Sequence, residues 1–374
     1  MTSRQVRFLR RVGAMAAKEV LHIRRDPRTL YMSLAMPVIM LLLLGFGLSF
    51  DIERIPLVIA DGDRSAASRD LARAIQGSHD FAAVLGSDAA AAEQALRRGQ
   101  ALAALLVPAG FARDLLSGRD APVQLLVDGS DGNLARQIMG KLDAIVRAHG
   151  QPSLGLAGTP PLQVQIYTLW NPAGRSALFM VPGVAAYLLA IAAVLLTALT
   201  IAAEWERGSM EQLFASPVGR LEIVLGKLLP YLALGMLQLL LVIALGTSVF
   251  DVPIRGSLPV ILLAGLLFLT GMLGQGLLIS VIARNQLVAT QAGALSSLLP
   301  SLMLSGMLVP IENMPRILQA LTVVVPARYL VHALRTLMLK GGGLAVVALD
   351  LVALGLFAVA ILALATLRFR RRLA

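Results

Sequence analysis

Long apolar runs with at most one charged residue alternate with short charged segments along most of this chain. A helix that crosses a bilayer needs about 20 consecutive apolar residues. Runs of this kind occupy residues 29–50, 176–203, 223–250, 258–283, 287–309 and 344–367. The pattern therefore predicts six transmembrane helices.

Residues 51–175, between the first two runs, follow a different pattern. Their apolar segments are too short to cross a bilayer, and 12 basic residues nearly balance 13 acidic ones. Strands are predicted at 55–60, 101–107 and 123–127, and helices at 65–76, 89–98, 110–116 and 134–148. Such alternation is typical of an α/β sandwich. The expected fold class is thus an α-helical integral membrane protein with six transmembrane helices and an inserted α/β extracytoplasmic domain between helices 1 and 2.

Three further segments are predicted at the membrane surfaces. Residues 1–28 carry many arginines around an apolar stripe with helical spacing, which is typical of an amphipathic helix lying on the cytosolic leaflet. Residues 311–343 contain two helical patterns too short to cross, divided by Pro326, and are predicted to form a re-entrant hairpin in the outer leaflet. Residues 368–374 form a basic cytosolic tail.

The Lys and Arg residues beside the apolar runs set the orientation, because cytoplasmic loops carry an excess of both. The N-terminal segment, the tail and the loops at 204–222 and 284–286 all contain them. We therefore expect both termini in the cytosol and residues 51–175 outside. Four basic residues of the hairpin then lie on the outer side, which counts against the charge rule unless they reach lipid phosphates: Arg316, Arg328, Arg335 and Lys340.

A charged segment, residues 204–222, separates the second and third apolar runs. Gly208 is expected to end the preceding helix, and Ser209 with Gln212 forms the pattern of a capping box that opens a new one. The next helix is expected to begin at Pro217, capped by the preceding serine. A short helix at the mouth of two spans would suit contact with a soluble partner. The expected coupling residues are Glu204, Glu206, Arg207, Gly208, Ser209, Met210, Glu211, Leu213, Phe214 and Pro217.

Composition supports membrane insertion and argues against several kinds of site. The chain is 57% hydrophobic and 15% charged, with a mean hydropathy of +0.76, whereas soluble domains are about 25% charged. It has no cysteine and four scattered histidines, so disulfides, Cys-based chemistry and a metal site are not expected. The basic residues lie beside apolar runs and aromatics are only 5%, so the +11 net charge indicates membrane lipid rather than nucleic acid.

Two further patterns resemble ligand motifs but lack essential residues. The Asp-Gly segments at 61–63 and 128–132 look like calcium loops, yet neither continues to the Glu of an EF-hand, and Asp-Gly after a strand is ordinary turn chemistry. The Gly-Lys pairs at 140–141 and 226–227 lack the upstream Gly and the following Ser or Thr of a phosphate-binding loop. No cofactor is expected on this chain, and ATP would have to be bound by another one.

Two long motifs resemble those of ABC-2 type transporter permeases. The first is Glu204-x-Glu206-Arg207-Gly208-Ser209-x-Glu211-Gln212-Leu213-x-x-Ser216-Pro217, followed by Gly226-Lys227-Leu228-Leu229-Pro230-Tyr231. The second is Ser305-Gly306-x-x-Val309-Pro310-Ile311-Glu312-Asn313-Met314-Pro315, followed by Pro326-x-x-Tyr329 and by Arg335 to Gly341. The departures are mild: Ser209 and Ser216 stand where Thr is common. The resemblance covers the whole chain, and the large outside domain points to the bacterial multidrug-type subgroup, often encoded beside a membrane fusion protein.

This resemblance implies a permease subunit without an ATPase site of its own, in the bacterial inner membrane. Two permease copies, identical or paralogous, would bind two cytosolic ATPase subunits, which hold ATP and Mg²⁺. The segment at 204–222 would carry the coupling helix, and the N-terminal helix would be its companion at the interface. A periplasmic fusion protein and an outer-membrane channel are further expected partners. The hairpin residues of the second motif are Glu312, Asn313, Pro315, Pro326, Tyr329 and Arg335.

The expected substrate is amphipathic, a drug or a lipid-like molecule, and three alternatives stay open. The same machinery could export a lipid-linked polymer. A secondary transporter would need repeats and ionisable residues near the midplane, and the outside domain could instead be a sensor. Asp350 is the one carboxylate within the predicted spans, and it either contacts a proton or substrate or lies close to the outer surface. Gln238 and Gln291 could join it in an intramembrane polar site or simply link helices, as could Gln275.

Overall fold

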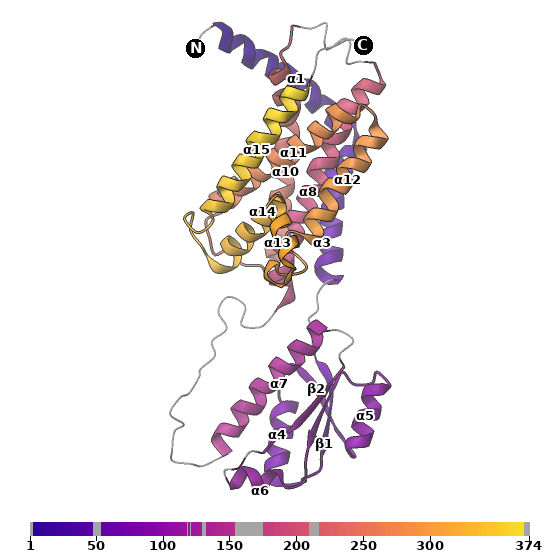
Figure 1. Ribbon diagram of the computed structural model, residues 1–374, viewed down its shortest axis with the longest axis vertical. Coiled ribbons are helices and arrows are strands. Elements are labelled where there is room, and N and C mark those ends of the chain that lie inside the picture. The colour runs from indigo at the N-terminus through magenta and orange to yellow at the C-terminus, as the bar shows by residue number, and fades with distance from the viewer. Residues whose placement is uncertain are drawn as a thin grey trace. The chain divides into compact units, whose positions relative to one another are not determined.

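The computed structural model describes residues 3–47, 54–117, 119, 121–128, 132–153, 175–208 and 217–369. Contacts divide the chain into two units. The helical unit comprises residues 1–49 and 168–374, and the α/β unit comprises residues 50–167 (Figure 1).

The helical unit is built from the helices at the two ends of the chain. Its first part contains α1 (Ser3–Arg25), α2 (Pro27–Leu30), a π-helical segment (Tyr31–Ala35) and α3 (Met36–Gly47). Its second part contains α8 (Ser176–Glu206), α10 (Arg220–Val249), α11 (Leu258–Ala283) and α12 (Gln286–Met303). A 3₁₀ turn (Ile311–Asn313), α13 (Arg316–Thr322), α14 (Pro326–Arg335), a second π-helical segment (Thr336–Lys340) and α15 (Ala348–Arg368) complete it.

Four of the described helices are long and apolar enough to cross a membrane, namely α8, α10, α11 and α15. Residues 316–322 and 326–340 form a helix pair bent by 86°, which would make a fifth span or a re-entrant loop. The predicted first span is represented by a shorter apolar helix, Ser33–Gly47, and residues 48–50 lie outside the described part. Length and composition thus support four or five spans, where the sequence predicted six.

The predicted fifth span, 287–309, is longer than the helix observed. α12 ends at Met303, and Gly306 adopts φ +79°, a left-handed conformation that interrupts a helix. The carbonyls of Gly306 and Met307 accept hydrogen bonds from the Arg335 guanidinium instead of continuing the helical ladder. A contact from α14, invisible in the local pattern, therefore helps to end α12.

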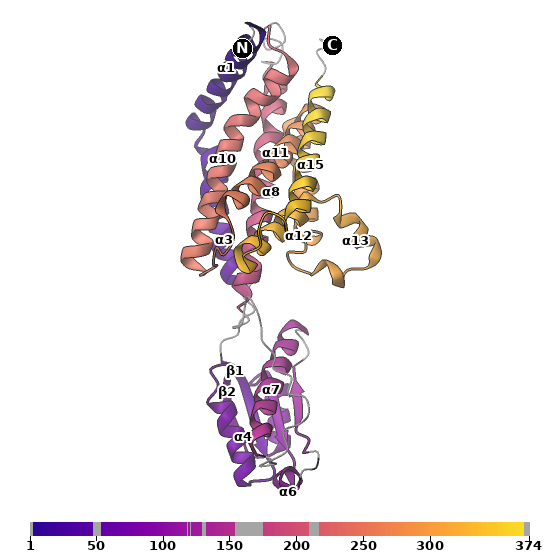
Figure 2. The same cartoon turned by 90° about the vertical axis from the view of Figure 1, so that its left-hand side faces the viewer.

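α11 lies against α8 and α15 in the interior of the helical unit (Figures 1 and 2). At Gly276 an added Cβ would lie 2.3 Å from the carbonyl oxygen of Val194, so this close approach requires glycine. Thr197 Oγ1 donates to the Leu273 carbonyl at 2.8 Å, and Ser280 Oγ accepts from the Ala202 N–H at 2.8 Å. Small residues and hydrogen bonds between helices are what holds spans together where lipid removes the hydrophobic driving force.

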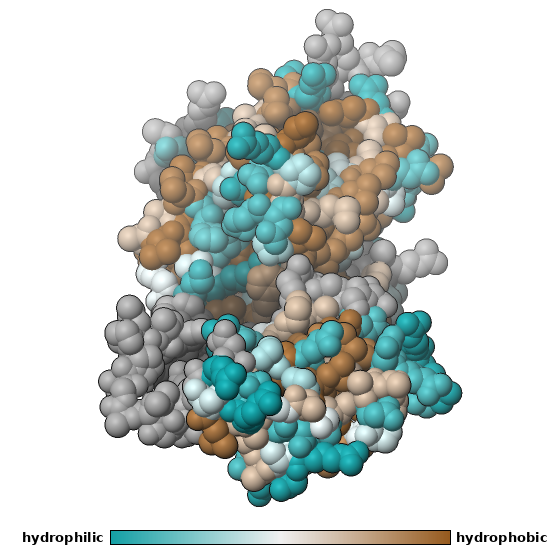
Figure 3. All heavy atoms as spheres, turned by 60° about the horizontal axis from the view of Figure 1, so that its bottom comes forward, coloured by the Kyte–Doolittle hydropathy of each residue, from teal (hydrophilic) through white to brown (hydrophobic). Residues whose placement is uncertain are grey.

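The outer faces of the helical unit carry many exposed apolar side chains (Figure 3). On α15, Leu349, Leu356 and Val359 are exposed by 84%, 67% and 69%. Water would make so much exposed apolar surface unfavourable, whereas hydrocarbon would not. The surface is therefore that of a helix in contact with lipid.

The α/β unit contains a four-stranded sheet with helices on both faces (Figure 1). Its elements are β1 (Ile55–Asp61), α4 (Ala66–Gln76), β2 (Phe81–Gly86), α5 (Ala89–Arg97), β3 (Ala103–Val107), α6 (Phe111–Leu116), β4 (Gln124–Val127) and α7 (Gly132–Ser153). The strand order is β2-β1-β3-β4; β1 runs parallel to β2 and β3, and β4 runs antiparallel to β3. Side chains of α4, α6 and α7 cover one face and those of α5 the other.

β2 was not predicted from the sequence, whereas strands were predicted at β1, β3 and β4. The strand signal of its own sequence is weak. Only Phe81 is buried, while Val84 and Leu85 are 64% and 58% exposed, so no alternation of buried and exposed positions marks the segment. Two alanines in its middle, Ala82 and Ala83, also lower the strand propensity.

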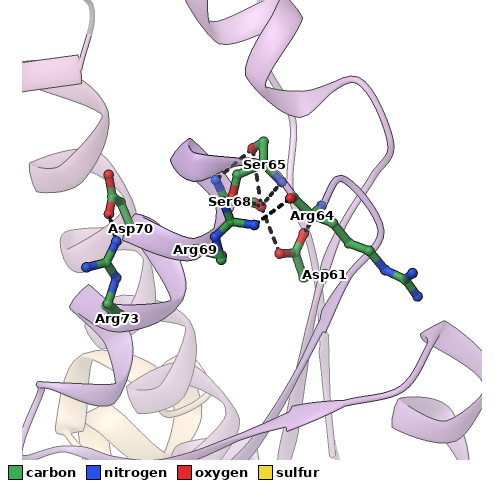
Figure 4. Close-up of polar contacts among 7 residues, drawn as sticks. All are labelled: Asp61, Arg64, Ser65, Ser68, Arg69, Asp70 and Arg73. Atoms are coloured by element: carbon green, nitrogen blue, oxygen red, sulfur yellow. Dashed lines mark hydrogen bonds and ion pairs between the residues drawn. The ribbon is translucent and has the colours of Figure 1, made fainter.

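The loop after β1 is fixed by its own side chains (Figure 4). Asp61 Oδ1 accepts from the N–H groups of Asp63 and Arg64, and Oδ2 accepts from Ser68 Oγ at 2.8 Å. The Asp63 carboxylate accepts from the N–H groups of Gly110 and Ala112. Hydrogen bonding, first to Ser65 and then to these backbone groups, lowers the pKa of Asp63. These carboxylates therefore serve as turn and helix caps, which explains their resemblance to a calcium loop.

Candidate coupling site at the ends of α8 and α10

A buried cluster of charged side chains joins α1, α8 and α10. Lys227 Nζ lies 2.7 Å from Glu19 Oε1 and 3.1 Å from Glu204 Oε1. Lys227 and Glu19 are only 1% and 4% exposed. Lys18, at the surface, lies 3.0 Å from the same Glu204 oxygen. Two carboxylates and two ammonium groups thus compensate each other, as buried charges require.

The packing of α1 against α10 brings the charged side chains of this cluster together. One face of α1, formed by Val12, Met15, Glu19 and Ile23, is buried, and α1 lies alongside α10 (Figure 2). At Gly226 an added Cβ would lie 2.4 Å from Met15 Cβ, so glycine permits the helices to approach closely. Glu19 falls on the buried face of α1, so water cannot hydrate its carboxylate. It pairs instead with Lys227, the residue that follows Gly226 in α10.

The coupling residues predicted on the other side of this cluster are only partly described. Ser209, Met210, Glu211, Leu213 and Phe214 lie within residues 209–216, outside the described part of the chain. The predicted stop at Gly208 is confirmed, because α8 ends at Glu206 and Gly208 adopts φ +70°. The predicted start at Pro217 is wrong: α10 begins at Arg220, and Glu222 Oε2 accepts the Gly219 N–H at 2.6 Å. The hydrogen bond from the N-cap N–H to a glutamate three residues later stabilises a helix start at this point, after the proline.

The end of α8 is also tied to the turn between α11 and α12. Glu206 accepts hydrogen bonds from the backbone and side-chain N–H groups of Gln286. The Arg284 guanidinium lies 4.7 Å from the centre of the Trp205 ring, a cation–π contact. Arg207 closes the helix, donating its N–H to the Ala203 carbonyl. The ends of α8, α11 and α12 are therefore linked around residues 204–207.

Arg335 corrects the prediction that the hairpin arginines reach outward to lipid phosphates. Its guanidinium turns inward, donating to the carbonyls of Phe179, Gly306 and Met307 at 3.2, 2.8 and 3.2 Å. It also lies 3.5 Å from the centre of the Phe179 ring. α14 is thereby pinned to α8 and to the segment after α12. Arg316 and Lys340 are exposed, whereas Arg328 is half-buried and donates to Thr322 Oγ1.

The other hairpin residues of the second motif shape its turns. Glu312 and Asn313 are exposed in the 3₁₀ turn, and Pro315 precedes α13. Pro326 is the first residue of α14, where its missing N–H costs nothing. Tyr329 Oη donates to the Val323 carbonyl at 2.8 Å, across the bend.

The structure does not bring Asp350, Gln238 and Gln291 together, since they lie on α15, α10 and α12 with different surroundings. Asp350 is the one carboxylate within the predicted spans, but it has a partner in the structure. It lies in the first turn of α15, and its Oδ2 is 2.7 Å from His332 Nδ1. Gln291 is exposed. Gln238 is 2% exposed, and its Nε2 is a buried donor without a partner in the described part. Gln275 does link helices, donating to Ser296 Oγ at 3.1 Å.

Sequence reasoning missed Glu19 and the pairing of Lys227, although a signal was present. Glu19 is the only acidic residue among residues 1–25, and Lys227 is the only charged residue among residues 223–250. A single acidic residue in a basic segment and a single basic residue in an apolar run carry opposite charges, which suggests that they form an ion pair. No cluster of three or more His, Asp or Glu side chains that could hold a metal occurs among the described residues.

Comparisons with known proteins agree with this architecture. Residues 27–367 match the family described as ABC-2 family transporter protein. The chain is 34% identical over 368 residues to "Probable multidrug ABC transporter permease YbhS" of Escherichia coli (strain K12), covering 97% of this chain and 98% of that protein. It is 29% identical over 342 residues to "Probable multidrug ABC transporter permease YbhR" of the same organism, covering 90% and 92%. "Inner membrane transport permease YhhJ" is 27% identical over 332 residues, covering 84% and 85%. By a match that spans nearly its whole length, this chain belongs to the ABC-2 family of transporter proteins.

Proposed function

We propose that this chain is the permease subunit of an ATP-driven exporter and that ATP is hydrolysed by separate cytosolic subunits. Family membership and the similarity to two probable multidrug ABC transporter permeases support this. The observation that carries the proposal is the buried Glu19–Lys227–Glu204 cluster, because it fixes both helices that flank residues 209–216 to α1. A push on the connecting segment would then move α1, α8 and α10 together rather than bending one helix alone.

The proposed substrate is amphipathic, a drug-like or lipid-like molecule leaving the cytosol or the inner leaflet. The apolar surfaces of the spans and the relatives' description as multidrug permeases favour this class. Two permease copies, identical or paralogous, would form the pathway between them. Transport assays in a drug-sensitive host, with and without the ATPase, would test it; no change in any efflux phenotype would favour lipid or polymer export.

The proposed topology has six membrane-crossing segments, both termini in the cytosol and the α/β unit outside, where it could contact a fusion protein. The cysteine-free sequence allows a direct test. A membrane-impermeant thiol reagent is expected to label Ser117→Cys in intact spheroplasts and Ala374→Cys only after the membrane is opened. Labelling of both variants from the same side would contradict the topology.

The proposed ATPase contact is made by residues 209–216, through Met210, Leu213 and Phe214, whose i, i+3, i+4 spacing would place them on one face of a helix. Phe214→Ala is expected to weaken copurification of the ATPase about thirtyfold, since losing an aromatic anchor costs about 2 kcal/mol or more. Glu211→Gln, the matched charge variant, should cost less and depend on salt. Wild-type copurification and wild-type substrate-stimulated ATP hydrolysis in a well-inserted Phe214→Ala protein would count against the contact.

A further inference from the structure

The start of α10 and the first turns of α1 enclose a pocket that the proposed transport function does not use. Its volume is 460 Å³, and its lining includes Arg7, Phe8, Arg11, Arg220, Leu221 and Glu222. Arg11 and Arg220 alone bring two guanidinium groups to a lining that has one carboxylate. Glu222 already accepts the Gly219 N–H at 2.6 Å and lies 3.6 Å from Arg11 Nη1. The pocket therefore retains a surplus of positive charge.

The pocket lies beside the first residue of a membrane-crossing helix. Arg220 begins α10, which is long and apolar enough to span a bilayer. The start of such a helix lies at the depth of lipid headgroups. The N-terminal end of a helix also favours an anion, because its free N–H groups and dipole are positive. An anionic group held here would be at the same level as a lipid phosphate.

Apolar side chains extend from the pocket along both helices. On α10, Leu221 and Leu229 lie two turns apart and are 47% and 46% exposed, with half-buried Leu225 between them. On α1, the apolar residues outside the face packed on α10 are also exposed: Val6, Leu9, Val20 and Leu21. A small soluble anion would gain nothing from these surfaces. Acyl chains would bury them.

We propose that this pocket binds the headgroup phosphate of an anionic phospholipid, with its acyl chains along Leu221, Leu225 and Leu229. Arg7, Arg11 and Arg220 provide charge-assisted hydrogen bonds to the phosphate. The bound lipid would hold α1 against α10 next to the Glu19–Lys227 pair, and so would set how firmly the coupling helices are joined. The inference requires that α10 crosses the membrane, and it does not depend on ATP-driven export.

The test uses the full chain purified in detergent, with dioleoyl-phosphatidylglycerol as the probe and dioleoyl-phosphatidylcholine as the neutral comparison. Native mass spectrometry measures the apparent Kd of the first bound lipid. Arg220→Gln is expected to weaken phosphatidylglycerol binding about fivefold, which corresponds to one basic contact with an anionic headgroup. Arg220→Lys should retain most binding. Arg24→Gln, an exposed arginine near the other end of α1, is the matched control and should bind as wild type does.

Other outcomes would overturn the proposal. Equal binding of both lipids, or wild-type affinity in Arg220→Gln, would exclude an anionic headgroup in this pocket. Competition by inorganic phosphate at the same affinity as the lipid would assign the pocket to a soluble anion. If Arg220→Gln fails to fold, Leu221→Gln is a second variant. It should weaken the binding of dioleoyl-phosphatidylglycerol, whose long acyl chains would contact Leu221, but not the binding of dihexanoyl-phosphatidylglycerol. Unchanged lipid binding together with lost ATPase copurification would assign the arginines to an acidic surface of the ATPase.

Discussion

Lys227→Met is expected to destabilise the helical unit by about 3–5 kcal/mol, the cost of removing one partner from a buried ion pair. The ammonium of Lys227 is the partner of both Glu19 and Glu204. Without it the buried Glu19 carboxylate loses the ammonium 2.7 Å away, and Glu204 keeps only Lys18, at the surface. Methionine keeps much of the volume, so the loss is mainly electrostatic. The expected fall in Tm is roughly 10 °C, measured by thermal unfolding in detergent.

Two controls separate charge from packing. Lys18→Ala removes the surface partner of Glu204. The Lys18 side chain is 56% exposed and the Glu204 side chain 15%, so solvent screens this pair more than the Glu19–Lys227 pair and its loss should cost less. The double variant Glu19→Gln/Lys227→Met should lose less than the sum of its single variants, because one stranded carboxylate is removed. Additive losses, or equal losses for Lys18→Ala and Lys227→Met, would show that the cluster is not a buried ion network.

Arg335→Leu is expected to release the hairpin from α8 and to destabilise the helical unit by at least about 3 kcal/mol. Three carbonyl oxygens lose a charged donor, and each buried acceptor left without a partner costs about 1–3 kcal/mol. Arg335→Lys should recover little, because an ammonium cannot reach three acceptors in the planar geometry of guanidinium. Limited proteolysis around residues 311–325 and thermal unfolding would measure the release.

Arg316→Leu is the matched control, since Arg316 is exposed on α13 in the same hairpin. It should leave both proteolysis and Tm close to wild type. If Arg316→Leu and Arg335→Leu had the same effect, the inward contacts of Arg335 would contribute nothing beyond a surface charge.

Several elements could be predicted because the signals for them are local. α11 has the predicted bounds at both ends, with a proline at its second position and Arg284 in the left-handed conformation that closes it. The predicted strands at 55–60, 101–107 and 123–127 overlap β1, β3 and β4. Buried residues mark β1 and β3, whereas β4 has none and was found from its short apolar run. β2 was not predicted, because its segment contains two alanines and ends in glycine, residues with low strand propensity.

Of the backbone features predicted around the site, the stop at Gly208 was right and the helix start at Pro217 was wrong. Gly208 ends α8 as expected, because only a residue free to adopt positive φ suits that position. The outward direction assigned to Arg335 followed from the neighbouring sequence, and the acceptors that turn it inward lie 28 to 156 residues away. Asp350 likewise gained a partner, His332, from a different helix.

The sequence by itself determined the membrane class, most helix positions, the α/β segment and the family motifs, because hydrophobic run length, periodicity and capping depend on residues within a few turns of one another. Only the tertiary structure decided which charges are buried together. Glu19 and Lys227 are 208 residues apart in the chain. Their contact exists because Gly226 lets α1 approach α10, and burial then makes any unpaired charge too costly to keep.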